Sequence, residues 1–315
     1  MLSRAAEQMF WMGRYVERAC NVARFVEVNY YLSLDWEEQY VQWEPLVQIT
    51  GDYEFFLSQS SQFDAQTVMQ FLLLDDNYQN SAIRSMANAR ENARASREYL
   101  PVEFWEELNR GFQLLQNHAA HGDSISLQTM QRLCGKITET GVHLQGICED
   151  YMWHGEGYQF FRLGVWIERA DKTSRFLHAK YFYLLPDSKD VGSPVDDLHW
   201  AALLHSLASL DIYHRQYGLV TPDKVISFLV LDDRFPRSIR FCLQRALGCL
   251  NAIVTPEREP PDNTRWHSIT LVLQLLAYVD AKKGADIVMD GLHEFINDFQ
   301  IRLNAAANGV QLDFF

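Results

Sequence analysis

A chain of 315 residues, 48% of them hydrophobic, is long enough to bury a substantial core without disulfide or metal crosslinks. Its formal net charge of -13 makes nucleic acid and anionic membrane surfaces unfavourable partners unless a strong basic patch is present. Charged residues, beginning with Arg4 and Glu7, interrupt the apolar stretches, so no membrane span or signal-peptide core can be drawn and we expect a cytoplasmic protein.

Apolar residues recur at three- and four-residue spacing in nearly every segment between turn signals, which predicts an all-α protein. About twelve helices are expected, at residues 3–33, 43–60, 64–74, 81–99, 102–118, 124–152, 156–185, 196–217, 222–231, 236–253, 263–281 and 285–306. Pro101 and Pro222 fit first helical turns, whereas Ser81 and Ser238 fit N-caps. A loop is expected from Pro186 to Pro194.

Two parts of the chain resemble each other. The aligned segments are residues 9–19 with residues 160–170, and residues 71–76 with residues 228–233. Two copies are too few for a solenoid, and both copies need partners for their apolar faces. We therefore predict a single helical domain over residues 1–315, formed by two pseudo-twofold related repeats at residues 1–154 and 155–315.

Each predicted repeat opens on a helix that carries an adjacent Glu-Arg pair, Glu17-Arg18 in the first and Glu168-Arg169 in the second. Apolar stripes surround these charges, so we expect them to be buried. Neighbouring residues on a helix point about 100° apart, so the members of one pair cannot bond each other well. Because a buried charge without a partner is costly, we expect Glu17 to meet Arg169 and Glu168 to meet Arg18 across a pseudo-twofold axis.

Gly13 and Gly164 each lie one turn before the glutamate of their helix, where they would let the two helices approach closely. Further arginines lie on the same or neighbouring stripes. The candidate site consists of Glu17, Arg18, Glu168, Arg169, Arg14, Arg24 and Arg175. These residues form either a structural polar network or a site for a ligand or partner, and the pattern assigns no catalytic residue.

The sequence lacks the GxSxG, HExxH, P-loop and GxGxxG motifs, so the commonest nucleophilic, zinc-protease and phosphate-loop chemistries have no basis in it. Its five cysteines form no CxxC pair, and we expect them to be buried reduced thiols. His118 and His121 share a helix face, but no third ligand accompanies them at metal-site spacing, so neither a metal nor a cofactor is expected. The apolar C-terminus, Leu312 to Phe315, is expected to follow the last helix and either pack on the domain or enter a partner's pocket.

Three motifs together resemble the bacterial Alpha-E family, also called domain of unknown function 403. They are MLSRAAEQMFWMGRYVERA, RLGVWIERADKTSRFL and FLVLDDRFPRSIRFCL. The resemblance covers essentially the whole chain and implies a helical domain with a Glu-Arg motif. The motif maps onto Glu17, Arg18, Glu168 and Arg169. Val165 stands where the first copy has Arg14, so the two copies are not strictly equivalent.

The resemblance implies context more than chemistry. Members of the family are associated with circularly permuted ATP-grasp proteins, with transglutaminase-like proteins and in some systems with a proteasome-like peptidase. We expect a non-catalytic accessory or binding subunit of an ATP-grasp amide or peptide ligase system. The alternative is an enzyme of peptide or amide chemistry between the two repeats, in which Glu17 or Glu168 is the general base and Arg18 or Arg169 holds an anionic substrate.

Overall fold

The computed structural model describes residues 1–35, 43–120, 125–182, 194–254, 260 and 266–315. Every regular element in these residues is helical, which confirms the all-α prediction. The first half contains α1 (Ser3–Asp35), α2 (Glu44–Thr50), α3 (Tyr53–Gln59), α4 (Ala65–Leu74), α5 (Ala82–Ala95), the 3-10 helix η2 (Arg97–Tyr99), α6 (Val102–Ala119) and α7 (Leu127–Tyr151). The second contains α8 (Glu156–Phe182), α9 (Pro194–Ser206), α10 (Leu210–Tyr217), α11 (Pro222–Ile226), the π-helical turn η5 (Ser227–Leu231), α12 (Ile239–Ile253), α13 (His267–Asp280), α14 (Gly284–Asp290) and α15 (Leu292–Phe314).

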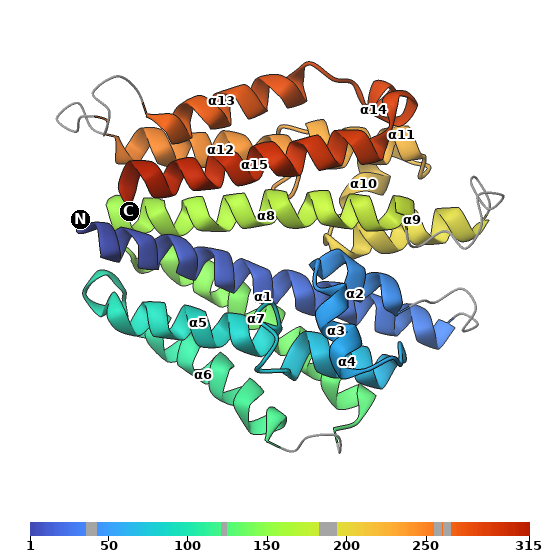
Figure 1. Cartoon of the computed structure of the whole chain (residues 1–315), viewed down its shortest axis with the longest axis horizontal. Coiled ribbons are helices and arrows are strands. Elements are labelled where there is room, and N and C mark those ends of the chain that lie inside the picture. Colours follow the sequence, from blue (N-terminus) through green and yellow to red (C-terminus); the bar gives the residue numbers. More distant parts are fainter. Residues whose placement is uncertain (36–42, 121–124, 183–193, 255–259, 261–265) are drawn as a thin grey trace.

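The long helices α1 and α8 lie side by side at the centre of the molecule (Figure 1). On one side α5 and α7 pack against α1, and α6 packs on both of them. On the other side α12 and α15 pack against α8, and α13 packs on both of them. The chain therefore places its two Glu-Arg helices at the junction of two helical layers.

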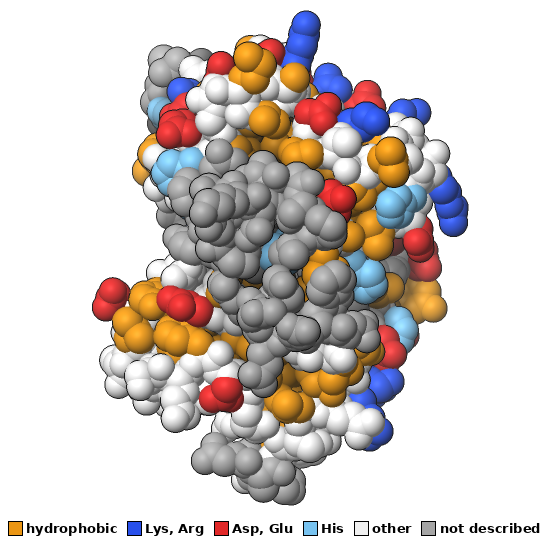
Figure 2. Space-filling view, turned by 90° about the vertical axis from the view of Figure 1, so that its right-hand side faces the viewer, with side chains coloured by type: hydrophobic (Ala, Val, Ile, Leu, Met, Phe, Trp, Pro, Cys, Tyr) orange, Lys and Arg blue, Asp and Glu red, His pale blue; other side chains and the backbone are white. Residues whose placement is uncertain are grey.

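Short helices link the two sides at one end of the molecule, because α2 contacts α8 and α9 contacts α1. Buried hydrophobic residues from both halves of the chain form one continuous core cluster. Figure 2 views this end and shows hydrophobic side chains in several patches among charged ones. The exposed apolar residues of the helices near this end include Phe55 and Leu57 in α3, Ile212 in α10 and Met289 in α14.

The backbones of α1 and α8 touch at two glycines. A Cβ atom added at Gly13 would overlap the carbonyl oxygen of Phe161, and one added at Gly164 would overlap the carbonyl oxygen of Phe10. The close approach predicted for these two helices is confirmed. The two contacts are reciprocal, whereas a pseudo-twofold relation of the complete repeats stays a prediction.

The described residues contain fifteen α-helices in place of the expected twelve, because three long segments are interrupted. Gly51 (φ 86°) separates α2 from α3, and Gly291 (φ 111°) separates α14 from α15. Ala208 (φ 53°) lies in the turn between α9 and α10. Left-handed backbone conformations end a helix, and a glycine adopts them readily whereas an alanine does so only when its surroundings impose it.

The predicted caps Ser81 and Ser238 are confirmed, since their hydroxyls accept backbone N–H bonds at 3.1 Å each. Pro222 lies in the first turn of α11, but Pro101 is the N-cap of α6 and precedes that turn. The loop expected between Pro186 and Pro194 lies outside the described residues except for Pro194, which begins α9. Within the described residues, no helix has both the length and the apolar character needed to cross a membrane.

The C-terminus was expected to extend beyond a helix ending near residue 306, which is wrong, because α15 continues to Phe314. The ring of Phe314 stacks on Trp266 with centroids 5.2 Å apart and meets Phe160 edge to face at 5.4 Å. Phe315 lies against Phe10 of α1. The apolar end of the chain thus packs on the domain, which was one of the two expected outcomes.

Candidate functional site

Glu17 of α1 and Arg169 of α8 form the first of two buried ion pairs. The Arg169 guanidinium donates from Nε to Oε1 of Glu17 at 3.0 Å and from Nη2 to Oε2 at 2.8 Å, so the pair is bidentate. Glu17 is fully buried and Arg169 is only 5% exposed. The ring of Trp166 lies under the same guanidinium, 4.7 Å from its central carbon. The cross-helix contact predicted for Glu17 is confirmed.

Three more side chains donate to the Glu17 carboxylate. Arg237, from the segment before α12, donates to Oε1 at 3.0 Å, as does the amide of Asn21. Gln145 of α7 donates to Oε2 at 3.1 Å. Each carboxylate oxygen therefore has at least two donors, which leaves the group with no free position for a substrate.

Charge dominates the protonation of this cluster. Burial alone would raise the pKa of Glu17, but Arg169 and Arg237 overcome that effect and hold its pKa well below the usual range. Burial, together with repulsion from Arg24 and Arg169, lowers the pKa of Arg237 to about 10 despite the attraction of Glu17. At neutral pH the carboxylate is ionised and both of its arginine partners are charged.

Glu168 of α8 and Arg18 of α1 form the second pair, as predicted. Arg18 donates from Nε to Oε1 at 2.6 Å and from Nη2 to Oε2 at 3.1 Å. Arg14 donates to Oε2 at 2.8 Å, and the ammonium of Lys172 lies 3.5 Å from Oε1. Burial alone would raise the pKa of Glu168, but Arg18, Arg14 and Lys172 lower it well below its usual value.

The second pair continues into a larger network on both sides. Arg18 donates to Asn80 at 2.9 Å, and Asn80 donates to Asp52 at 2.6 Å. On α8, Asp171 lies 3.2 Å from Lys172 and accepts from Arg175 at 2.9 Å. The predicted site residue Arg175 is thus linked to Glu168 through its own helix, not across the helix interface.

Arg24 is the predicted residue that the structure places apart. Its charge contributes to lowering the pKa of Glu17, but within the described residues it forms no hydrogen bond to that carboxylate, and its buried Nη1 has no hydrogen-bond partner there. Arg24 lines a separate cavity of about 530 Å³, together with Thr138 of α7 and Arg215 of α10.

In the described residues, the cavity that adjoins the two ion pairs is small. A cavity of about 20 Å³ adjoins Arg18, Lys172 and Asn80, and about 10–15 Å³ is the space that one water needs. A larger cavity, of about 510 Å³, is lined by Trp166 and lies between α7, α8 and α12. The motif charges are therefore satisfied by one another and by neighbouring side chains.

Several network members were absent from the sequence-based site. Arg237, Gln145, Asn80 and Asp171 come from four different parts of the chain. Arg237 had a usable signal, since it lies in the third family motif immediately before the Ser238 cap. Gln145 had no such sequence signal, because a single glutamine on an amphipathic helix is typical of a solvent-facing position.

The described residues hold no group of three or more His, Cys, Asp or Glu side chains placed to bind a metal ion. All five cysteines are buried free thiols, as expected. Burial raises the pKa of Cys20 to about 11 and that of Cys242 to about 12. Neither thiol is a nucleophile at neutral pH, because the thiolate is the reactive form.

This fold and site define an all-helical protein organised around two reciprocal Glu-Arg pairs at the contact of its two central helices. The chain belongs to the Alpha-E family, whose description is "a predicted alpha-helical domain with a conserved ER motif"; the match covers residues 1–315. It is also similar to uncharacterized proteins of Mycobacterium bovis and Mycobacterium tuberculosis, with 24% identity over 265 residues. That match covers 77% of this chain and 29% of each relative. No solved structure matches the chain.

Proposed function

We propose that this chain is a non-catalytic accessory or binding subunit that works in the cytoplasm with an ATP-grasp amide or peptide ligase. The observation that carries the proposal is the burial and pairing of the two motif carboxylates. Glu17 and Glu168 are fully buried, and each accepts hydrogen bonds from at least two cationic side chains. Their pKa values are lowered, so neither carboxylate is suited to take up a proton near neutral pH.

The length of the relatives supports a role beside other protein components. The matched region is 29% of each mycobacterial relative, so in those proteins it is joined to further sequence. Exposed apolar side chains such as Leu219 and Met289, 81% and 85% exposed, offer surface for a protein contact. The partner itself is inferred from the associations of the family, which include ATP-grasp, transglutaminase-like and proteasome-like proteins.

The alternative of an enzyme using the Glu-Arg motif receives less support from the geometry. A general base must reach the proton that it abstracts, directly or through one water. The space beside Arg18 and Lys172 is about 20 Å³, too small for an amino acid. An enzyme would therefore have to open the contact between α1 and α8, where the backbones meet at Gly13 and Gly164.

Co-purification from the native cell tests the proposal. A tagged chain should retain an ATP-grasp protein through stringent washing, and purified components should then show that the chain alters ligation or ATP hydrolysis by that protein. The Glu168→Gln variant distinguishes a structural from a catalytic role of the motif. A structural network predicts that melting temperature and partner binding fall together, whereas a catalytic role predicts lost turnover in an intact complex. Recovery of no ligase, peptidase or transglutaminase-like protein would contradict the proposal.

A further inference from the structure

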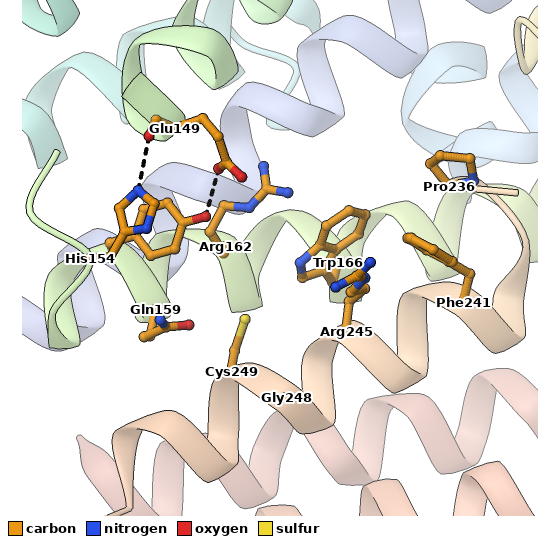
Figure 3. Close-up of a pocket in the computed structure, with 11 residues that line it drawn as sticks. Glu149, His154, Gln159, Arg162, Trp166, Pro236, Phe241, Arg245, Gly248 and Cys249 are labelled. Atoms are coloured by element: carbon orange, nitrogen blue, oxygen red, sulfur yellow. Dashed lines mark hydrogen bonds between the residues drawn. The ribbon is translucent and has the colours of Figure 1, made fainter. Parts of the chain in front are cut away.

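The cavity beyond Trp166 has the dimensions of a small-ligand site (Figure 3). Its volume of about 510 Å³ lies within the roughly 300–1,000 Å³ typical of such sites. Trp166 of α8 and Phe241 of α12 form an apolar wall, with ring centroids 5.7 Å apart in an edge-to-face contact. Cys249 also lines the cavity, and burial raises its pKa to about 12, so it contributes a neutral thiol.

Two arginines in the cavity wall are held by aromatic rings. The guanidinium carbon of Arg162 lies 4.6 Å from the centroid of Trp166, and that of Arg245 lies 4.8 Å from the centroid of Phe241. Neither arginine forms an ion pair or a side-chain hydrogen bond with any described residue. Stacking fixes the plane of a guanidinium while leaving its N–H edge available, which is the arrangement that binds a carboxylate through two parallel bonds.

Trp166 adds a third donor. Its side chain is only 6% exposed, but its indole N–H is accessible and donates to no residue in the part of the chain that the structure describes. Two guanidinium groups and one indole N–H that bond no described residue therefore line one cavity, and together they form a set of donors suited to an anion.

The other end of the cavity limits the charge of that anion. Glu149 accepts a hydrogen bond from Tyr158 at 2.6 Å, and His154 stacks on the same tyrosine with ring centroids 4.0 Å apart. Two arginines and one glutamate leave a single excess positive charge among these groups. This balance fits a monoanion such as a carboxylate and opposes a phosphate dianion.

The Glu17–Arg169 pair holds the apolar wall in place. Arg169 stacks on Trp166 and donates from Nη1 to the backbone oxygen of Pro236 at 3.4 Å, and both of these residues line the cavity. The buried motif therefore positions two cavity residues without itself contacting a ligand.

We propose that this cavity binds the free C-terminal carboxylate of a peptide, through Arg162, Arg245 and the indole N–H of Trp166, with the terminal apolar side chain against Trp166 and Phe241. The proposal rests on the proposed function, since a carboxylate is the group that an amide or peptide ligase activates. The chain would present this end of the peptide to its partner.

Calorimetric titration with N-acetyl-L-phenylalanine and with its C-terminal amide tests the site. The acid should bind, and the amide should bind at least about tenfold more weakly because it offers no charge to the arginines. Arg245→Met should weaken binding of the acid by about tenfold while retaining the apolar stem that covers Phe241. Arg302→Met is the matched control, because Arg302 also stacks on an aromatic ring, that of Tyr278 at 4.7 Å, but does not line this cavity.

Equal binding of the acid and the amide, no binding of the acid at millimolar concentrations, or unchanged binding by Arg245→Met would each overturn the site. Inorganic phosphate that binds the cavity more tightly than N-acetyl-L-phenylalanine would overturn the assignment to a carboxylate. These results are independent of the co-purification. If a ligase co-purifies but the chain binds acid and amide equally, the proposed function stands and the carboxylate site is refuted. If the chain prefers the acid but no such partner co-purifies, only the proposed function is refuted.

Discussion

Replacing Glu17 with glutamine gives the sharpest test of the buried network. The substitution keeps the size of the side chain but removes the charge that neutralises Arg169 and Arg237. The new amide would also point an N–H donor toward groups that are themselves donors. Both arginines would then be buried without a counter-charge, since Arg169 is 5% and Arg237 8% exposed.

The expected loss follows from the cost of an unpaired buried charge. Removing one member of a buried pair costs about 3–5 kcal/mol, out of a total stability of about 5–15 kcal/mol for a typical domain. For a chain of 315 residues this corresponds to a fall in Tm of roughly 5–8 °C. Urea unfolding followed by circular dichroism, together with calorimetry, measures both quantities.

Glu139→Gln provides the control, because Glu139 pairs with Lys136 at the surface and is 57% exposed. Its urea midpoint should match that of the unsubstituted protein, because the side chain lies in solvent. The double variant Glu17→Gln/Arg237→Met should be less destabilised than the sum of its single variants by about 0.5–3 kcal/mol, since both single variants remove the same Glu17–Arg237 ion pair. A Glu17→Gln protein as stable as Glu139→Gln would refute the reasoning, because it would mean that the Glu17 charge is not desolvated.

Three further predictions concern the helix contact, pH and the C-terminus. Gly13→Ala should lower the free energy of unfolding by about 3 kcal/mol or more, because its Cβ would overlap a carbonyl of α8. Gly146 faces open space, so Gly146→Ala should be neutral or stabilising by up to about 1 kcal/mol. Similar urea midpoints for the two variants would contradict the close approach of α1 and α8. The folded-state pKa of both motif glutamates is lowered, so the stability that they provide is complete above their unfolded pKa. It should be lost as pH falls below about 4.3, by about 1.4 kcal/mol per pH unit for each glutamate. Glu168→Gln should lose stability less steeply, and equal pH dependence of the free energy of unfolding in the two proteins would disprove the lowered pKa. Phe314→Ala should lower the free energy of unfolding by about 3–5 kcal/mol. Leu312 is 72% exposed, so Leu312→Ala should lower it by less than about 0.5 kcal/mol. Equal urea midpoints for the two variants would show that the C-terminus does not pack on the domain.

The pairing of the motif charges could be predicted because two constraints acted together. The apolar stripes of the first helix required burial, and burial required a partner for each charge. The alignment of Glu17-Arg18 with Glu168-Arg169 then offered a reciprocal solution, which the distances bear out. Local patterns also located the N-caps at Ser81 and Ser238, since a serine before an apolar run has a specific role at a helix start.

The rest of the site depends on tertiary position, which local patterns do not contain. Arg237 reaches Glu17 from a segment between helices, where no periodicity indicates the direction of a side chain. The turn at Ala208 has a positive φ at a residue that ordinarily avoids it, so propensity favoured the continuous helix that was predicted. The cavity beside Trp166 needs α7, α8 and α12 together, and its arginines resemble ordinary surface residues until those helices meet.

The reciprocal pairs are best understood as devices that fix the register of α1 against α8. Burying an ion pair yields little net stability, because the cost of desolvation offsets most of the attraction, so specificity is the better-supported role. Sliding α8 by one turn, about 5.4 Å, would move Arg169 out of hydrogen-bonding distance of Glu17 and bring residues with a Cβ atom against the carbonyls that now face Gly13 and Gly164. Each alternative register therefore combines unpaired charge with steric overlap. Since Arg169 also supports Trp166, the same register determines the shape of the cavity that we assign to a carboxylate ligand.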